Sequence, residues 1–203
     1  TDKPNFYNDL DEVLNTIWDL LLIGKSKAKS EFHQGYISTI TDDFPSIRTV
    51  VLRHVSKSSN TISFHTDFRS KKIDELNNNR KISMLFYDHA KKIQIKISGN
   101  AEIHNMNHVS KVAWGQSKTF SKKCYIVKNP PGSLSDTPTS GYLIEHEKEL
   151  PENEILESGY KNFTMVTIQI ECIEWLYLHR DGHRRAFFKY NNKNLIEKNW
   201  LTP

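Results

Sequence analysis

Two short cationic segments hold the residues that could bind an anion. Arg48 and Arg53 stand at either end of the run 49–52, whose β-branched and aliphatic residues are typical of a strand. A second segment, 70–72, reads Ser-Lys-Lys where a helical pattern begins. Cationic side chains and the free N–H groups of a helix N-terminus favour phosphate. Because an apolar strand offers a flat ring a surface to lie on, these segments predict a site for a phosphorylated, planar cofactor.

Length and composition indicate one globular domain. The chain has 203 residues, of which 37% are hydrophobic and 26% charged, and these values are typical of folded proteins. The net charge is only +4 and the Lys and Arg residues are scattered, which favours an anionic small ligand over nucleic acid. A nucleic-acid-binding barrel would need basic and aromatic residues interleaved on one sheet face, and we see no such interleaving.

Several features indicate a cytoplasmic protein without a membrane partner. No apolar run is long enough to cross a membrane, and residues 1–4 do not begin a signal peptide. Cys124 and Cys172 are too few for a disulfide framework, so we expect reduced thiols that serve packing. The histidines lack the spacing of a metal site, and we therefore expect no metal.

Hydrophobic periodicity predicts a mainly β fold with flanking helices. Apolar residues at helical spacing from Leu10 to Leu21 predict a helix over 8–24, whose apolar face either packs on the domain or binds a partner. A period of two follows, and short strands joined by turns are typical of an antiparallel barrel. Gly99 is expected to form a bulge or kink. The expected strands are 33–41, 47–55, 61–66, 82–87, 93–103, 163–178, 186–190 and 195–201. The expected helices are 71–79, 106–117 and 145–157, the last interrupted near Pro151, and the expected turns or loops include 42–46, 129–141 and 181–182.

Four separated segments match a known family, in the family's order: 48–53, 64–72, 94–102 and 175–185. On these residues the chain resembles the pyridoxamine 5′-phosphate oxidase family of FMN-binding split barrels. The segment 121–125 and the Pro-Pro-Gly loop after it are similar to the shorter oxidase-like subgroup. The resemblance implies one FMN-binding domain over 1–203, with a helix at about 8–24 and an antiparallel barrel at about 33–203.

The resemblance implies an FMN site at the two-fold interface of a homodimer. Side chains at 48 and 70–72 would hold the phosphate, and the backbone of 50–52 would lie along the flavin ring. Arg185 would bring a cation near the carbonyl edge of the ring, where it supports hydride acceptance. The implied cofactor-binding residues are Arg48, Thr49, Val50, Val51, Leu52, Arg53, His65, Thr66, Ser70, Lys71, Lys72, Gln94, Ser121, Trp175 and Arg185.

The substrate side departs from the family pattern. Asp181 stands where the family has an arginine for the substrate phosphate, and Arg53 replaces a lysine that faces the substrate. Trp114 and Ser117 occupy the region of a further Tyr-Arg-Ser set. An aspartate repels a phosphate, so we expect poor turnover of B6 phosphates. The candidate catalytic residues are His183 and Arg53.

Each candidate also has a structural interpretation. Arg48 and Arg53 could be strand-end charges in water, and Ser70 could be a helix N-cap. Gln94 could face outward from its strand, and Trp175 could be a core anchor. His183 could line a substrate pocket or lie on the surface rather than move a proton.

Two functions therefore stay open. The first is a flavin-dependent oxidoreductase that acts on a small-molecule substrate near Arg53, Trp114 and His183. The second is a non-catalytic protein that binds FMN or a B6 vitamer. Intact cofactor residues beside altered substrate residues fit either function, and a turnover assay separates them.

Overall fold

The N-terminal part of the chain forms a capped amphipathic helix. The computed structural model describes residues 5–41 and 43–203, so the signal-peptide expectation for residues 1–4 and position 42 of the expected turn lie outside the described residues. After a 3-10 helix, Asn5–Asn8 (η1), helix α1 spans Leu10–Ser26. The Asp9 carboxylate caps α1 by accepting the backbone N–H groups of Asp11 and Glu12 at 2.8 and 3.0 Å. The helix buries Val13, Ile17, Trp18 and Leu21. Its apolar face therefore packs on the protein itself, which is the first of the two interpretations of the sequence.

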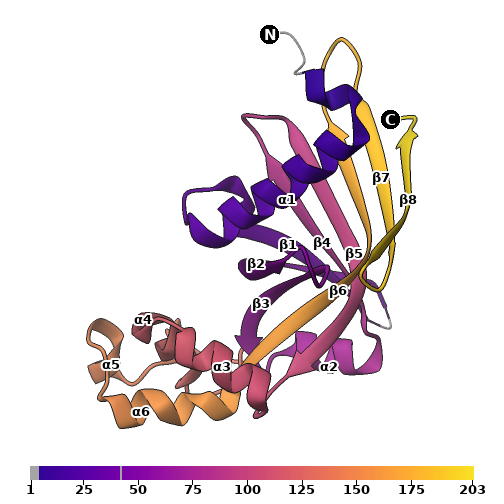
Figure 1. Ribbon diagram of the computed structural model, residues 1–203. Coiled ribbons are helices and arrows are strands. Elements are labelled where there is room, and N and C mark those ends of the chain that lie inside the picture. Colours follow the sequence, from indigo (N-terminus) through magenta and orange to yellow (C-terminus); the bar gives the residue numbers. More distant parts are fainter. Residues whose placement is uncertain (1–4, 42) are drawn as a thin grey trace. The chain divides into compact units, whose positions relative to one another are not determined.

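The described strands form an antiparallel sheet that closes into a barrel. Their order is β3-β2-β1-β4-β5-β6-β7-β8, and an additional pairing of β3 with β6 closes the first six strands (Figure 1). Strands β7 and β8 continue outward from β6. This topology confirms the predicted mainly β fold with flanking helices. The strands are β1 Gln34–Ile40, β2 Pro45–Ser56, β3 Thr61–Asp67, β4 Lys81–Asp88, β5 Ile93–His104, β6 Phe163–Tyr177, β7 Arg184–Asn191 and β8 Asn194–Leu201.

The chain divides into two compact units, which we describe separately. Unit 1 comprises the residues up to 64 together with 79–102 and 167–203, and unit 2 comprises 65–78 and 103–166. Along β1 and β4 of unit 1, buried side chains alternate with more exposed ones, as a period of two requires. Its core includes the fully buried side chains of Trp18, Phe32, Ile37, Leu52, Phe86 and Trp175.

Gly99 lies in a close approach of two strands, and the predicted bulge there is wrong for the pairing of β4 with β5. That pairing runs without a shift from Lys81 opposite Asn100 to Asp88 opposite Ile93. A Cβ atom at Gly99 would lie 2.0 Å from the carbonyl oxygen of Gln169. The glycine is therefore needed because another backbone occupies the space of a side chain.

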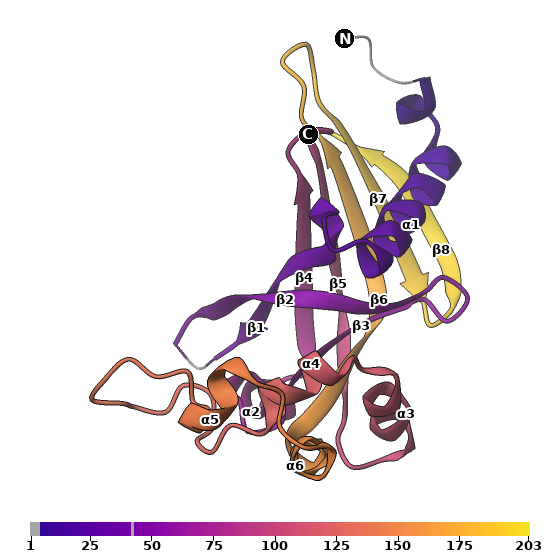
Figure 2. The ribbon, with the colours of Figure 1, turned by 90° about the vertical axis from the view of Figure 1, so that its left-hand side faces the viewer.

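Unit 2 is mostly helical and has a small aromatic core. Helix α2 spans Lys71–Asn78 and buries Ile73 and Leu76, as predicted. The rings of Trp114, Tyr125 and Phe163 meet edge to face, with centroids 5.1–5.8 Å apart. Figure 2 shows α3, α4, α5 and α6 of this unit. The further helices are α3 His108–Gln116, α4 Thr119–Lys122, η3 Lys123–Tyr125, α5 Ile144–Lys148, α6 Asn153–Ser158 and η4 Gly159–Asn162.

The helices of unit 2 follow the sequence signals closely. The break expected near Pro151 falls between the end of α5 and the start of α6. In α3 the side chain of Trp114 is buried, whereas Val109 and Val112 are exposed and add little to the core. Within the part of the chain that is described, no helix is long and apolar enough to cross a membrane.

Candidate cofactor site

In unit 1, the arginine that opens the first cationic segment is held at the start of β2. The Arg48 guanidinium donates to the carbonyl oxygen of Ser46 at 2.9 Å and to the hydroxyls of Ser46 and Thr39. Arg48 lies opposite Ile37 of β1, and its side chain is half-buried. These contacts fix the direction of a cation that would otherwise move freely at the strand surface.

The rest of this segment alternates between the core and the surface. Val50 and Leu52 are buried, so only their backbone groups could meet a ligand, as the resemblance implies. Thr49 is exposed and Val51 is half-buried. The register of β2 with β3 shifts between Leu52 and His54. Arg53 lies at this irregularity, and its side chain is exposed. The sequence contains no glycine at this position that could have indicated the shift.

In unit 2, three of the predicted cofactor-binding residues come together at the start of α2. The Lys72 ammonium donates to the Thr66 hydroxyl at 2.9 Å, and that hydroxyl lies 3.3 Å from the Ser70 hydroxyl. Thr66 and Ser70 are buried, and Lys71 is exposed beside them. Hydroxyls, an ammonium and a helix N-terminus form a donor set that fits a phosphate.

The other two predicted residues of unit 2 are His65, directly before Thr66, and Ser121. His65 packs its ring edge on Phe163, with centroids 4.7 Å apart. Ser121 lies in α4, where its backbone N–H donates to the Lys118 carbonyl oxygen at 2.8 Å. Its side chain is half-buried.

In unit 1, Gln94 and Arg185 stand beside an ion-pair network. The Arg185 guanidinium donates to the Glu174 carboxylate at 2.6 Å, and Lys96 pairs with the same carboxylate. Gln94 lies two residues before Lys96 on β5 and therefore faces the same side of the sheet. Sequence reasoning missed Glu174, because no local motif marks a carboxylate that pairs with residues on neighbouring strands.

Trp175 faces the core of unit 1. Its side chain is fully buried, and the rings of Tyr7 and Tyr177 lie 5.1 and 6.3 Å from its ring. Its indole N–H has no hydrogen-bond partner among the described residues. Trp175 pairs with Ala186, whereas Arg185 pairs with Leu176, so Trp175 and Arg185 point to opposite faces of the sheet. The described chain thus matches the core-anchor interpretation of Trp175, and its contact with a flavin stays a prediction.

A pocket of about 330 Å³ lies in unit 1 where β7 begins and β8 ends. It brings together two predicted site residues, His183 and Arg185, with Arg184, whose Nε donates to Asn8 at 3.3 Å. The backbone N–H of His179 donates to Nδ1 of His183 at 2.9 Å, which orients the imidazole. The pocket is lined by Asn8, His183, Arg184, Arg185, Trp200, Leu201 and Pro203. Cationic and aromatic groups around such a space suit a planar anion.

Asp181 is not among the residues that line this pocket. Its side chain is 66% exposed and lies 3.5 Å from His179 and 3.6 Å from Arg180. Because solvent screens an exposed carboxylate, Asp181 repels a phosphate only weakly. The absence of an arginine at this position affects phosphate binding more than this repulsion does.

The Glu174 carboxylate gives the stability of unit 1 a pH dependence. Burial would raise the pKa of Glu174, but the hydrogen bonds and charges of Lys96 and Arg185 outweigh it and lower the pKa. A lowered pKa in the folded state contributes stability above the ordinary Glu value of about 4.3, and this stability is lost as the pH falls through the lowered pKa.

We expect Glu174→Gln to lower the free energy of unfolding at pH 7 by on the order of 1 kcal/mol, since both cations are partly exposed. The difference from the wild type should shrink as the pH falls below the ordinary Glu value. Urea unfolding across this range measures it. Glu171→Gln, which alters a more exposed pair with Lys81, is the control. A difference that stays constant down to acid pH would contradict the assignment.

Among residues 5–41 and 43–203 the structure shows no group of three His, Cys, Asp or Glu side chains that could hold a metal ion. Cys124 is an exposed free thiol, and Cys172 is a half-buried one. Burial raises the pKa of the Cys172 thiol, with a further contribution from Glu174, which favours its neutral form.

The fold is that of a split barrel with flanking helices. It matches the crystal structure of a pyridoxamine 5′-phosphate oxidase-related, FMN-binding protein from Nostoc punctiforme, with a TM-score of 0.74, 15% identity and all of both chains covered. It also matches PhzG from Burkholderia lata, solved in complex with tetrahydrophenazine-1-carboxylic acid. Here the TM-score is 0.71 and the identity 17%, over 100% of this chain and 98% of that one.

Two sequence comparisons bear on the predicted resemblance. Residues 15–105 match the model of the pyridoxamine 5′-phosphate oxidase FMN-binding domain. The chain is also 25% identical over 196 residues to pyridoxine/pyridoxamine 5′-phosphate oxidase 2 of Arabidopsis thaliana, with 91% of this chain and 94% of that protein covered. These matches confirm the predicted resemblance to the pyridoxamine 5′-phosphate oxidase-like FMN-binding family, and with it the predicted cofactor, FMN.

Proposed function

We propose that the protein is an FMN-dependent oxidoreductase of the pyridoxamine 5′-phosphate oxidase type. The observation that carries the proposal is the cluster of Thr66, Ser70 and Lys72 at the start of α2 in a chain with an FMN-binding-domain match. In this proposal the cluster holds the FMN phosphate, together with Arg48, Lys71 and Ser121. The whole of 1–203 acts as one FMN-binding domain in a cytoplasmic protein.

The remaining predicted residues address the flavin ring and the substrate. Bound FMN supplies hydride acceptance, and the protein supplies orientation and electrostatics. Gln94 and the backbone of 49–53 would donate to and accept from the polar edge of the ring, and Arg185 would stabilise negative charge there. His183 in its pocket would hold or move a proton of a small-molecule substrate, and Arg53 would attract an anionic one. His65 would add a wall to the site.

We expect the purified protein to be yellow, or to take up FMN with flavin absorbance in the blue. The expectation follows from the donor set at the start of α2, which suits the phosphate that distinguishes FMN from riboflavin. An absorption spectrum, followed by titration of the FMN-free protein, measures it. A protein that binds neither FMN nor FAD at micromolar concentration would remove the basis of the proposal.

The alternative function, a non-catalytic FMN or B6-vitamer binding protein, is favoured by one observation. The substrate-side arginine of the family is absent, and Asp181 in its place is exposed. The two functions differ in one assay: the FMN-loaded protein is mixed with candidate substrates without oxygen, and loss of the oxidised flavin absorbance is followed. Bleaching by any substrate supports the oxidoreductase, and binding without bleaching supports the alternative.

A homodimer is part of this proposal, and an apolar face of unit 1 supports it. Tyr36 and Ile40 of β1 are about half exposed, while Phe44 and Ile47 at the start of β2 are two-thirds exposed. Ile47 lies opposite Ser38, between Tyr36 and Ile40, so the side chains of Tyr36, Ile40 and Ile47 share one face of the hairpin, and Phe44 precedes β2. An exposed apolar face of this kind is typical of a protein interface.

We expect sedimentation to show a dimer in dilute solution and Ile47→Asp to shift it toward monomer. A charge in the middle of an apolar interface loses its hydration without gaining a partner. Leu134→Asp, at a fully exposed position of unit 2, is the matched control and should leave the dimer intact. A wild-type monomer that still carries FMN would contradict the proposed dimer site.

A further inference from the structure

Arg69 directly precedes the second cationic segment, 70–72, and its charge is already matched by a buried carboxylate. The Asp67 carboxylate accepts the Arg69 backbone N–H at 2.8 Å, Nε at 3.0 Å and Nη2 at 2.7 Å. The side chain of Asp67 is 6% exposed and that of Arg69 is 23% exposed. This fork-like pairing holds the guanidinium in one orientation. The Arg69 cation is therefore already paired inside unit 2.

The remaining donors of Arg69 reach a second segment of the chain. Nη1 donates to the carbonyl oxygen of Lys128 and Nη2 to that of Val127, both at 3.1 Å. These residues open the long connection 126–143 between η3 and α5, which contains no helix or strand. A loop of this length needs specific contacts to stay ordered. Arg69 supplies two of them at the point where the loop begins.

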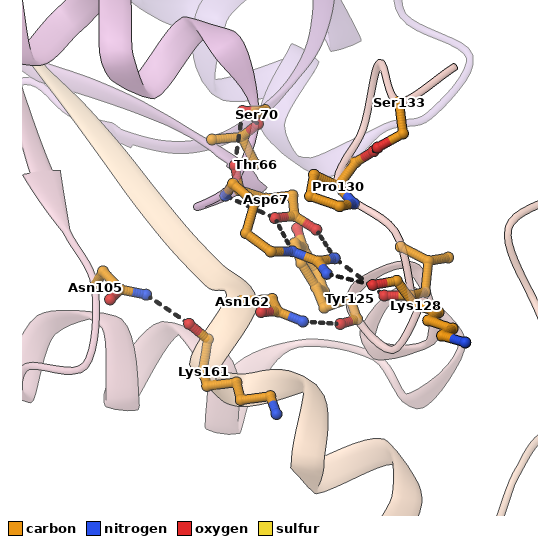
Figure 3. Close-up of polar contacts among 12 residues, drawn as sticks. Thr66, Asp67, Ser70, Asn105, Tyr125, Lys128, Pro130, Ser133, Lys161 and Asn162 are labelled. Atoms are coloured by element: carbon orange, nitrogen blue, oxygen red, sulfur yellow. Dashed lines mark hydrogen bonds and ion pairs between the residues drawn. The ribbon is translucent and has the colours of Figure 1, made fainter. Parts of the chain in front are cut away.

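A second set of contacts holds the same place. The backbone N–H of Phe68 donates to the Asn162 carbonyl oxygen at 2.7 Å, and the Asn162 side chain donates to the Tyr125 carbonyl oxygen at 2.8 Å. Figure 3 shows the contact of Asn162 with Tyr125, and it places Asp67 between Tyr125 and Lys128 on one side and Thr66 and Ser70 on the other. Hydrogen bonds thus join the turn 66–70 to the start of the loop at 125–128.

The turn 66–70 is also connected to the proposed phosphate cluster. The Asp67 carbonyl oxygen accepts the Ser70 backbone N–H at 3.1 Å and the Ser70 hydroxyl at 2.7 Å. The Ser70 hydroxyl in turn lies beside Thr66, which accepts from Lys72. The position of Asp67 therefore sets the position of the hydroxyl and the ammonium that the proposed function assigns to the phosphate.

We propose that Arg69 is a positioning residue: with Asp67 it fixes the turn 66–70 to the loop start at Val127 and Lys128, and so preorganises the phosphate site without touching the phosphate. The proposal rests on the proposed function, because it concerns the same FMN site. It separates Arg69 from Lys71 and Lys72, which belong to the same cationic run and keep their role as phosphate ligands.

The alternative, that Arg69 binds the phosphate itself, predicts opposite results for two mild variants. Arg69→Lys keeps the positive charge and loses the fork, so a direct contact would largely survive it, whereas the link to Asp67, Val127 and Lys128 would not. Asp67→Asn removes a negative charge near the site and releases the guanidinium, so a direct contact would strengthen. If Arg69 positions the site, FMN binding weakens in both variants.

The experiment measures FMN and riboflavin affinities of the full chain by flavin fluorescence. We expect Arg69→Lys and Asp67→Asn each to weaken FMN by about tenfold or more, as for the loss of one charge-assisted hydrogen bond, and to change riboflavin by less than about twofold. Limited proteolysis should cleave 126–143 faster in both variants. Arg80→Ala, an exposed arginine of unit 1, is the control for loss of a positive charge.

The outcomes separate the inference from the proposed function. A wild-type protein that does not bind FMN contradicts the proposed function. A wild-type protein that binds FMN, together with an Arg69→Lys variant of unchanged affinity or an Asp67→Asn variant of higher affinity, overturns the inference alone. If thermal melting shows that Asp67→Asn does not fold, Arg69→Lys decides the question through FMN affinity and the cleavage rate of the loop.

Discussion

Replacing Arg48 and Lys72 together with alanine is expected to weaken FMN binding by two to four orders of magnitude and riboflavin binding far less. Each charge-assisted contact to a phosphate contributes about 1.5–3 kcal/mol, and about 1.4 kcal/mol corresponds to a factor of ten in affinity. Both side chains are already directed by neighbours, Arg48 by Ser46 and Lys72 by Thr66, so little ordering cost offsets this contribution. Isothermal titration of the FMN-free protein with both flavins measures the difference.

The control for this experiment is Arg80→Ala combined with Lys111→Ala. The pair removes the same two positive charges at exposed positions, one in each unit, and so isolates a contact from a general change in net charge. Equal losses of FMN and riboflavin in the Arg48 and Lys72 variant would show that these residues do not read the phosphate. A loss confined to one of the single variants would assign the phosphate to that residue alone.

The sequence predicts the elements of this fold well because local patterns determine them. Apolar residues at helical spacing mark α1, and the period of two marks each strand to within a few residues. Proline and glycine mark the breaks, as Pro151 does between α5 and α6. Gly99 shows the limit of such signals: the residue indicates that something unusual happens, and only the approach of Gln169 says what it is.

The site is harder to predict because its residues depend on partners far away in the sequence. Trp175 reads as a flavin neighbour until Tyr7 is found packed on its ring. Arg69 carries no prediction from the sequence, and its role follows from Asp67 and from the carbonyl groups of Val127 and Lys128. Glu174 has no local motif at all, and its role follows from Lys96 and Arg185 on the neighbouring strands. Contacts of this kind are set by topology and not by spacing.

Asp181 illustrates how burial changes an electrostatic argument. From the sequence alone, an aspartate in place of an arginine predicts a strong repulsion of a substrate phosphate. With two-thirds of its side chain exposed, the repulsion is weak, and the larger effect is the missing bidentate contact. Arg184 lines the neighbouring pocket, but its Nε is engaged with Asn8. Poor turnover of B6 phosphates therefore remains the expectation, for a different dominant reason.

The substitution Asp181→Arg is accordingly expected to raise kcat/KM for pyridoxine 5′-phosphate by about tenfold to a hundredfold, the range of one charge-assisted pair of about 1.5–3 kcal/mol. The gain should appear mainly as a lower KM, because the phosphate is bound equally in the ground state and the transition state. Asp181→Asn removes the repulsion without adding a cation, so it should change kcat/KM by less than about threefold, as befits an exposed charge.

Steady-state kinetics of the FMN-loaded wild type and both variants decide between these contributions. Pyridoxine, which lacks the phosphate, is the matched substrate and should respond to neither substitution. Efficient wild-type turnover of pyridoxine 5′-phosphate would mean that Arg184 or another cation already serves the phosphate, and Asp181→Arg would then add little. An equal gain from Asp181→Asn and Asp181→Arg would return the dominant role to charge repulsion. Only a gain confined to the arginine variant, and to the phosphorylated substrate, supports the missing contact as the cause.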